Sequence, residues 1–423
     1  MQLSLLGAPP EPPLPLPALR RAEPCTVSLV TDRRAFDALA DQWRVIEATA
    51  RGAVLFQSYD WCRAVWDHWL RKARPFEPRI LIARRGSETV GILPLRIVRR
   101  GPLRIATGLA EPFQQYSDAI LSPDQGHDVV DALLGAALRL DACDGIELLK
   151  VRDDSPLAGA LASNGAVRAA EDAAPYIDLR GFKEFADYHA TVKPKTRKNI
   201  RNSRNRITRM HRLEHRVITC REDIRVLVAR TYRGRERWLK ELGLTSRAFR
   251  EDTFPDFLDE LASGGHGLSV LAMSLEADGR PIADQWGVVF NGRYYAYGAT
   301  WDPLYEEFSP GKLHLEDVIR ACHELEIGTA DFLMPAAHYK LTWTDDVMPV
   351  ADFALPCSWR GRIYASCWIG ALRPQLKRLA LATPDRARSL LATLIFARRG
   401  VPSSETARLP ASPENPTGCG RPI

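Results

Sequence analysis

The clearest alternation of hydrophobic and polar positions lies in residues 286–343. Two runs of apolar and aromatic residues flank Asn291-Gly292 and predict a β-hairpin, because both turn residues tolerate a positive φ. After a loop, apolar positions at spacings of three and four predict a helix that ends before Gly328. A short strand is expected over 329–334. The hairpin strands are expected at 286–290 and 294–298, and the apolar helix positions are Leu313, Leu315, Val318, Ile319, Cys322 and Leu325.

The predicted helix begins with Ser309, Pro310, Gly311 and Lys312. A serine hydroxyl can accept from the first free N–H groups, and proline lacks an N–H that would be unpaired at this position. A small-residue loop before a helix exposes unpaired N–H groups and the positive end of the helix dipole. We therefore expect these four residues to bind a phosphate or another anion. The alternative is an ordinary helix start that binds nothing.

The order of the elements predicted in the first half of the chain is repeated in the second half. A hairpin around Arg85-Gly86, a helix and a strand correspond to a hairpin around Asp278-Gly279, a helix and a strand. We infer a duplicated α/β (α+β) unit over 25–178 and 179–355, each copy a mixed, mostly antiparallel sheet flanked by helices. The other expected elements are strands at 26–30 and 146–151, a pair of neighbouring strands through 105 and 119–121, and helices at 35–49, 59–70, 128–143, 223–239 and 254–262.

A strongly basic run, Lys193–Arg216, lies between the hairpins of the two copies. Ile200, Ile207, Met210 and Leu213 form a thin apolar stripe, which predicts one helix with a docked edge and a basic exposed face. Because like charges repel, we expect an anion or a polyanion to contact this face, and the alternative is a solvated surface. His211 and His215 are one helical turn apart without a third ligand, so no metal site is expected. The residues expected to bind the anion are Lys195, Arg197, Lys198 and Arg201.

Composition fits an ordinary folded protein. The 423 residues, 45% hydrophobic and 26% charged, accommodate two or three domains with sizeable cores, and the net charge of +6 is modest. Eight cysteines without a C-x-x-C pair argue against a zinc ribbon or a thioredoxin-like site and indicate reduced thiols. No signal peptide pattern is present, and no apolar run reaches the roughly 20 residues that cross a bilayer. We therefore expect a cytoplasmic protein.

The two ends of the chain differ from the middle. Proline-rich residues 1–24 predict a disordered lead, with a ligand for an aromatic groove as the alternative. Residues 356–400 predict two basic amphipathic helices, at 359–381 and 386–398, that could contact an anionic membrane surface or another subunit. Packing on the second copy is the alternative. Residues 401–423 are expected to be a disordered tail.

Together these features resemble the GNAT acyltransferase superfamily, specifically its double-domain branch. That branch includes the CelD-like acetyltransferases of cellulose biosynthesis and is related to the Fem-type aminoacyltransferases. The resemblance covers about residues 25–355. It rests on the order and spacing of several short motifs, which are Phe56-Gln-Ser-Tyr-Asp-Trp61, Val90-Gly-Ile-Leu-Pro-Leu95, Lys195-Thr-Arg-Lys-Asn-Ile-Arg201, Gly279-Arg-Pro-Ile-Ala283, Ser309-Pro-Gly311, Asp331-Phe332 and Tyr339-Lys340.

The resemblance implies that acetyl-CoA or another acyl-CoA lies along the strands at 281–298, with its pyrophosphate at the loop that begins the helix. That loop has one glycine and Pro310 where the family usually has an Arg/Gln-rich loop with two glycines, and Lys312 could add a point charge. Direct transfer to an amine needs a base and an acid. The candidate bases are Asp331, Asp284 and His338, and the candidate acids are Tyr339 and Tyr297. The alternatives are that Asp331 caps a turn, Tyr297 belongs to the core and Asp284 pairs with an arginine.

The resemblance favours an acyl-CoA-dependent N-acyltransferase acting on a small-molecule or glycan-precursor amine, with a structural first copy and no metal. A second hypothesis is an aminoacyl-tRNA donor bound by the basic run, which would make binding strongly dependent on salt. A third is a non-catalytic scaffold that binds an anionic polymer or a membrane surface. Nucleic acid as the main partner is disfavoured, because no recognised reading motif accompanies the basic residues.

Overall fold

The computed structural model describes residues 24–375, apart from 51, 124, 126, 245 and 374. The predictions for the proline-rich lead, for the basic helix at 386–398 and for the C-terminal tail therefore lie outside the described residues. Within the described ranges, no helix combines the length and the hydropathy that a membrane crossing requires.

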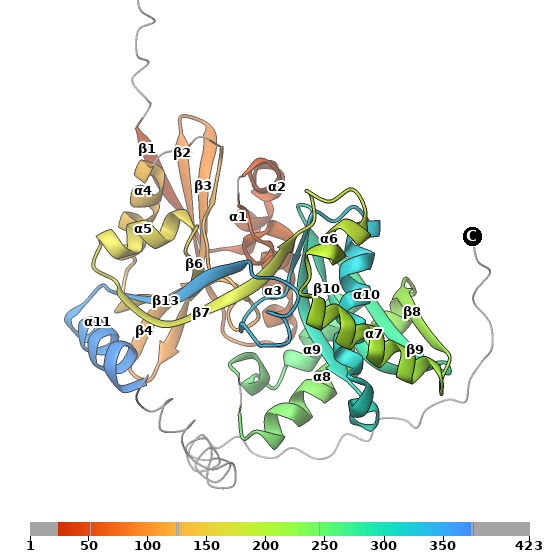
Figure 1. The fold of residues 1–423 in the computed structure, drawn as a ribbon. Helices are drawn as coiled ribbons and strands as arrows, with labels where there is room; N and C mark the ends of the chain where they lie inside the picture. The colour runs from red at the N-terminus through yellow and green to blue at the C-terminus, as the bar shows by residue number, and fades with distance from the viewer. Residues whose placement is uncertain are drawn as a thin grey trace, which may run out of the picture.

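The predicted mixed α/β fold, mostly antiparallel and flanked by helices, is confirmed (Figure 1). The strands are β1 (Cys25–Val30), β2 (Glu77–Arg85), β3 (Glu88–Arg100), β4 (Leu103–Gly108), β5 (Ile120–Leu121), β6 (Gly145–Arg152), β7 (Val167–Asp178), β8 (Leu213–Ile218), β9 (Ser269–Ala277), β10 (Arg280–Phe290), β11 (Arg293–Trp301), β12 (Thr329–Asp331) and β13 (Val347–Pro356). The α-helices are α1 (Arg33–Asp37), α2 (Ala40–Thr49), α3 (Tyr59–Arg71), α4 (His127–Leu138), α5 (Pro156–Ser163), α6 (Phe185–Thr191), α7 (Pro194–Thr208), α8 (Arg221–Glu241), α9 (Phe254–Ser263), α10 (Pro310–Glu324) and α11 (Trp359–Ile363). Short 3-10 segments are η1 (Leu55–Gln57), η2 (Ala248–Arg250) and η3 (Pro303–Phe308), and a π-helix, η4 (Tyr364–Leu372), continues α11.

The described part of the chain forms one sheet of 13 strands in the order β1-β2-β3-β4-β6-β13-β7-β12-β11-β10-β9-β8, with β5 beside β3. We call β1–β6 the first unit and β8–β12 the second unit. In both units an antiparallel series ends in a parallel pair, β4 with β6 and β11 with β12. The repeated order supports the predicted duplication, and the proposed boundary at 178 and 179 remains a prediction.

The two units exchange strands at the centre of the sheet. β7 follows the first unit in sequence but pairs with β12 of the second, and the last strand, β13, returns to pair with β6 of the first. β7 and β13 also pair with each other, and Figure 1 shows them crossing the middle of the molecule. The exchange makes each unit's sheet depend on a strand that the sequence places with the other.

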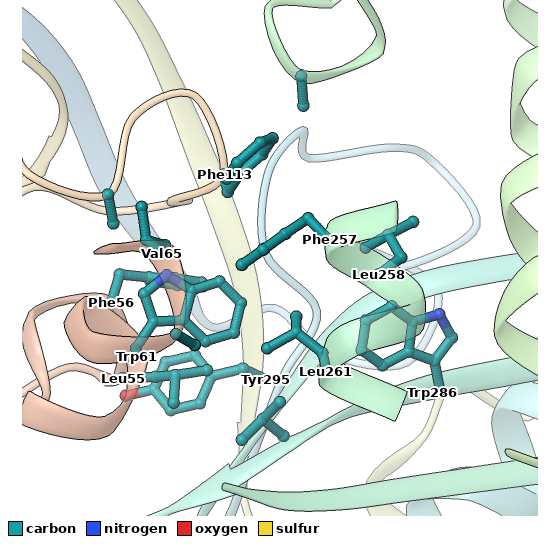
Figure 2. Packing of buried hydrophobic residues seen from close by; sticks show 14 of the residues in the cluster. Leu55, Phe56, Trp61, Val65, Phe113, Phe257, Leu258, Leu261, Trp286 and Tyr295 are labelled. Carbon is teal, nitrogen blue, oxygen red and sulfur yellow. The ribbon is translucent and has the colours of Figure 1, made fainter. Parts of the chain in front are cut away.

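A shared hydrophobic core holds the units together on one side of the sheet. Leu55, Phe56, Trp61, Val65 and Phe113 come from the first unit, and they meet Phe257, Leu258, Leu261, Trp286 and Tyr295 of the second (Figure 2). The rings of Phe113 and Phe257 stack with centroids 4.3 Å apart. Separate cores lie under α4 and α5, under α1 to α3, and under α6, α7 and α10.

The predicted hairpins are confirmed. Asn291-Gly292 and Asp278-Gly279 form two-residue turns between β10 and β11 and between β9 and β10. All four turn residues have a positive φ, between 48° and 75°, which suits their residue types. The hairpin at Arg85-Gly86 is also present, between β2 and β3.

The predicted helix over Lys193–Arg216 is wrong in its second half. α7 ends at Thr208, and β8 begins at Leu213 and pairs with β9. The Asp278 carboxylate accepts from the Arg212 N–H and bonds the His211 ring, both at 2.8 Å, which turns the chain into the sheet. Met210 is 68% exposed, so it does not extend the apolar stripe.

Other differences concern element boundaries and connections. The helix expected at 35–49 is divided into α1 and α2, and β5, expected beside β4, pairs with β3. The sequence analysis predicted none of β7, β13, α5 or α6. Two of these, β7 and β13, are the exchanged strands.

Candidate functional site

The candidate site is formed where β11 and β12 separate. The two strands pair only from Arg293 with Thr329 to Tyr295 with Asp331. Beyond this pairing β11 continues, whereas the segment after β12 turns away from it. The Phe332 N–H therefore donates to the Pro175 carbonyl instead of to β11. A bulge leaves Tyr297 without an opposite residue on β10, because Trp286 lies opposite Gly298 and Gly287 opposite Ala296. A bulge at such a position leaves backbone groups unpaired, as is common beside active sites.

A cavity of about 2010 Å³ lies at this separation. One wall is β11 from Ala296 to Ala299, and another is the segment from Phe332 to Pro335. The first unit contributes Glu111 and Lys150, and α8, α11 and η4 complete the wall. A cleft of this size with charged groups in its wall is the strongest candidate for a substrate site among the described residues.

Glu111 is the carboxylate that stands out in this wall. The residue is 4% exposed, and among the residues that the structure describes its side chain has no hydrogen-bond or ion-pair partner. Burial raises the pKa of Glu111, against the opposing effects of Arg247 and Lys150. Burial also lowers the pKa of Lys150, whose ammonium donates to Gln115 Oε1 at 2.8 Å. A buried carboxylate with a raised pKa facing a cavity has the properties of a general base.

Lys340, another buried charge, holds the segment that separates from β11. Its ammonium donates to the carbonyl oxygens of Phe332, Leu333 and Pro335 at 2.8, 2.9 and 3.1 Å. Burial and the nearby Arg235 lower the pKa of Lys340 to about 8. The three bonds fix the backbone that forms one side of the cavity.

The two predicted acids both line the cavity, in different surroundings. The Tyr297 hydroxyl donates to the Phe113 carbonyl at 2.6 Å, and its ring packs against Trp61 and Trp286. Burial and the Glu111 carboxylate raise the pKa of Tyr297. The Tyr339 side chain has no hydrogen-bond partner within the described ranges; desolvation raises its pKa, and Arg235 lowers it. Tyr339 is therefore the freer proton donor.

The two predicted aspartate bases are buried and paired. Asp331 accepts from Tyr116 at 3.0 Å, from Arg293 at 3.0 Å and from the Leu333 N–H at 2.9 Å. The Asp284 carboxylate accepts from Nε and Nη2 of Arg230, at 2.6 and 3.0 Å, and from the Ser274 hydroxyl. Neither carboxylate lines the cavity. The third candidate base, His338, is exposed and also lies outside the cavity wall.

Ser309, Pro310, Gly311 and Lys312 begin α10 as expected, but the Ser309 side chain does not cap the helix. Its backbone is left-handed, with φ 53°, whereas a capping serine needs an extended backbone. The Ser309 carbonyl instead accepts from the N–H groups of Lys312 and Leu313, at 3.0 and 3.3 Å. Lys312 is exposed, and none of the four residues lines the cavity.

The predicted anion-binding residues lie on α7. Lys195, Lys198 and Arg201 are exposed, and neither they nor Arg197 form an ion pair with any residue that the structure describes. The buried Arg197 Nε also has no hydrogen-bond partner. By contrast, Arg204 on the same helix bonds Glu316 and Asp317 of α10, each at 2.8 Å. The ion pairs of Arg204 therefore attach α7 to α10, whereas Lys195, Lys198 and Arg201 carry positive charge that no described residue neutralises.

The sequence analysis missed the contribution of the first unit to the cavity. Glu111 lies in the long connection between β4 and β5, where Glu111-Pro-Phe-Gln-Gln-Tyr116 follows neither helical nor strand periodicity. A polar and aromatic connection between predicted strands was the available signal. It was not used, because the first unit was expected to be structural.

Comparison with known proteins supports the acyltransferase prediction. Residues 194–341 match the family described as the acetyltransferase (GNAT) domain. The matched stretch begins with α7 and includes β11, β12 and α10, which contain or adjoin the cavity. The protein is therefore an acyltransferase with a GNAT domain. No curated protein matches the chain.

Solved structures agree with the fold. The crystal structure of FemX superposes with a TM-score of 0.54 at 11% identity, covering 77% of this chain and 97% of that one. At this identity the similarity supports the fold alone. Weaker similarities are to a tandem GNAT protein from the clavulanic acid biosynthesis pathway (TM-score 0.45, 17% identity, 79% of this chain and 99% of that one covered) and to L-PGS from Bacillus licheniformis (TM-score 0.42, 12% identity, 70% and 90% covered).

Proposed function

We propose that the protein transfers an acyl group directly from acyl-CoA to an amine. The observation that carries this proposal is the cavity at the separation of β11 and β12, within a stretch that matches the GNAT acetyltransferase domain. The short motifs of the sequence further favour the CelD-like branch, with an amine of a polysaccharide or cell-envelope precursor as acceptor. A cytoplasmic location is part of the same proposal.

The residues at the start of α10 fit a CoA pyrophosphate. Pro310 has no N–H, the Gly311 N–H has no backbone partner within the described ranges, and Lys312 is exposed. An unpaired N–H at the positive end of a helix dipole attracts a phosphate. The thioester supplies the activated acyl group, and Ser309, Pro310, Gly311 and Lys312 would hold its pyrophosphate.

The cavity wall provides an acid and a base at different positions. Glu111 would take the proton from the acceptor ammonium, because its carboxylate is buried beside the cavity without a partner. Tyr339 would protonate the departing thiolate, since its hydroxyl is free of hydrogen bonds to described residues. Asp331 and Asp284 keep their ion pairs and position the strands. On this proposal the first unit contributes to catalysis.

The unneutralised face of α7 favours a second candidate donor, an aminoacyl-tRNA. Lys195, Lys198 and Arg201 are exposed and unpaired among the described residues, which suits contact with a phosphate backbone. Neutralising several phosphates makes affinity fall steeply with salt. A Lys195→Ala, Lys198→Ala and Arg201→Ala triple variant would then lose tRNA binding at low salt, whereas an acyl-CoA enzyme would keep its donor affinity.

Thermal melting in the presence of acetyl-CoA and longer acyl-CoAs tests the donor. A ligand that binds the native state raises the melting temperature. The Gly311→Glu variant should lose the shift, because a carboxylate at the helix start repels the pyrophosphate. The matched control is Gly159→Glu in α5, an exposed helical glycine with open space around it. No shift of the wild type with any thioester would contradict the proposal.

A further inference from the structure

Two cysteines that are far apart in the sequence meet where β13 returns to the first unit. Cys143 precedes β6, and Cys357 follows β13. Pro356 pairs with Gly145 at the end of the ladder, and the N–H of Cys357 donates to the Asp144 carbonyl at 2.9 Å. The backbone therefore fixes both cysteines side by side. Both cysteines are free, and the Cys143 thiol donates to the Gly145 carbonyl at 3.2 Å.

The pair is accessible through a second cavity, separate from the candidate active site. This cavity, about 500 Å³ in volume, is lined by both cysteines, by Arg104, Arg139 and Arg360, and by Asp141 and Asp144. Cys357 is partly exposed, whereas Cys143 is 9% exposed. The three arginines outnumber the two aspartates, and a net positive charge favours the thiolate form of a cysteine.

The two sulfur atoms differ in acidity, which assigns their order of reaction. The neighbouring Cys357 thiol lowers the pKa of Cys143 to about 7. The same contact and burial raise the pKa of Cys357. By contrast, burial raises the pKa of Cys62 and Cys322, which face no second thiol. Reactive cysteines combine thiolate character with access.

We propose that Cys143 and Cys357 form a reversible dithiol–disulfide site whose oxidant is a peroxide. The Cys143 thiolate attacks a peroxide oxygen, breaks the O–O bond and becomes a sulfenic acid, releasing hydroxide or an alkoxide that takes up a proton. The Cys357 thiol then attacks this sulfur and displaces water. Two electrons pass from the thiols to the peroxide, and a dithiol reductant reverses the reaction by exchange.

The disulfide would tie the exchanged strand to the first unit. α11 begins at Trp359, two residues after Cys357, and α11 and η4 form part of the wall of the large cavity. The Arg360 guanidinium already donates to the Pro102 carbonyl at 3.0 Å beside the cysteine pair. Oxidation would therefore hold the start of this wall more firmly. This inference is independent of which acyl donor the enzyme uses.

Peptide mapping of the full-length protein after treatment with hydrogen peroxide tests the site. We expect a cross-linked peptide that joins Cys143 to Cys357, its loss on reduction, and a higher melting temperature for the oxidised than for the reduced protein. Cys143→Ser and Cys357→Ser should each abolish the cross-link and the shift. Cys220→Ser should keep both, because Cys220 is exposed and its thiol bonds Glu222 instead of a cysteine.

Hydrogen exchange gives a second measurement, which does not depend on any variant. Amides of α11 should exchange more slowly in the oxidised wild type than in the reduced wild type, whereas amides of α8 should not change. Recovery of Cys143 and Cys357 as separate, alkylatable thiols after peroxide treatment would overturn the proposal. Cross-links that join either residue only to other cysteines would overturn it as well.

Discussion

At the scale of single residues, Glu111 decides whether the cavity is catalytic. Replacing it by glutamine keeps the shape but removes the proton acceptor, so kcat should fall by about 10² to 10⁴, the usual contribution of a general base. Burial raises the pKa of Glu111, and a base must be deprotonated. The acidic limb of the wild-type pH–rate profile should therefore lie above the ordinary carboxylate range and disappear in Glu111→Gln.

The control for this change is Asp284→Asn, which alters a carboxylate of the same region that is paired with Arg230 outside the cavity wall. That variant should lower the melting temperature, because it removes the buried charge that pairs with the partly exposed Arg230, and the pH limb should remain. If Glu111→Gln kept both the wild-type kcat and the acidic limb, the base would have to be another group.

The residues of the site show what a sequence can and cannot indicate. Asp331 lies at the end of a central strand, β12, as expected, whereas Asp284 lies within β10. The sequence could not show that Arg293 and Arg230 pair with them, since these partners depend on tertiary contacts. Glu111 was missed because its role also depends on tertiary structure. Its importance comes from lacking a partner inside a cavity between two units, which no local pattern records.

At the scale of elements, local chemistry predicted the turns well and failed where a distant contact competed. Asn291-Gly292 and Asp278-Gly279 carry their turn geometry in their own residue types. The segment after Thr208 has helical residue types as well. It becomes β8 because the edge of β9 and the carboxylate of Asp278 provide bonds that a continued helix would lack.

The segment formed by α11 and η4 carries a prediction at this scale. Its inner residues Ala365 and Ile369 pack on Ala354, whereas Trp359 and Ile363 are 73% and 55% exposed. Aromatic and aliphatic side chains beside arginines suit an anionic bilayer surface. We expect the protein to co-sediment with vesicles that contain an anionic phospholipid, and Trp359→Glu to reduce this binding severalfold.

The matched control is Leu304→Glu in η3, because Leu304 is equally exposed, at 75%, on a different element. It should bind vesicles as the wild type does. Equal binding of both variants would show that this segment is not the contact. A lowered melting temperature of Trp359→Glu in the absence of vesicles would instead indicate that other parts of the chain cover Trp359.

At the scale of the whole molecule, the duplication was predictable but the exchange of strands was not. The order of hairpin, helix and strand recurs in the sequence and in the sheet. β7 and β13, however, were not predicted from the sequence as strands of either unit. Their places depend on the edges of β12 and β6, which form only when both units are present. The exchange also explains how residues of the first unit come to line a cavity of the second.

The exchange predicts that the two units unfold together. Phe353 lies in β13, is 2% exposed and packs in the core of the first unit. Phe353→Ala should lower the free energy of unfolding by about 3 to 5 kcal/mol through the lost burial and the cavity left behind. Because β13 joins both units, hydrogen exchange of the most protected amides should accelerate equally in β3 and β10. Val45→Ala, at a position that is 67% exposed, should change neither. Acceleration confined to β3 would mean that the first unit opens alone, and that the exchanged strands connect the units without making them one cooperative structure.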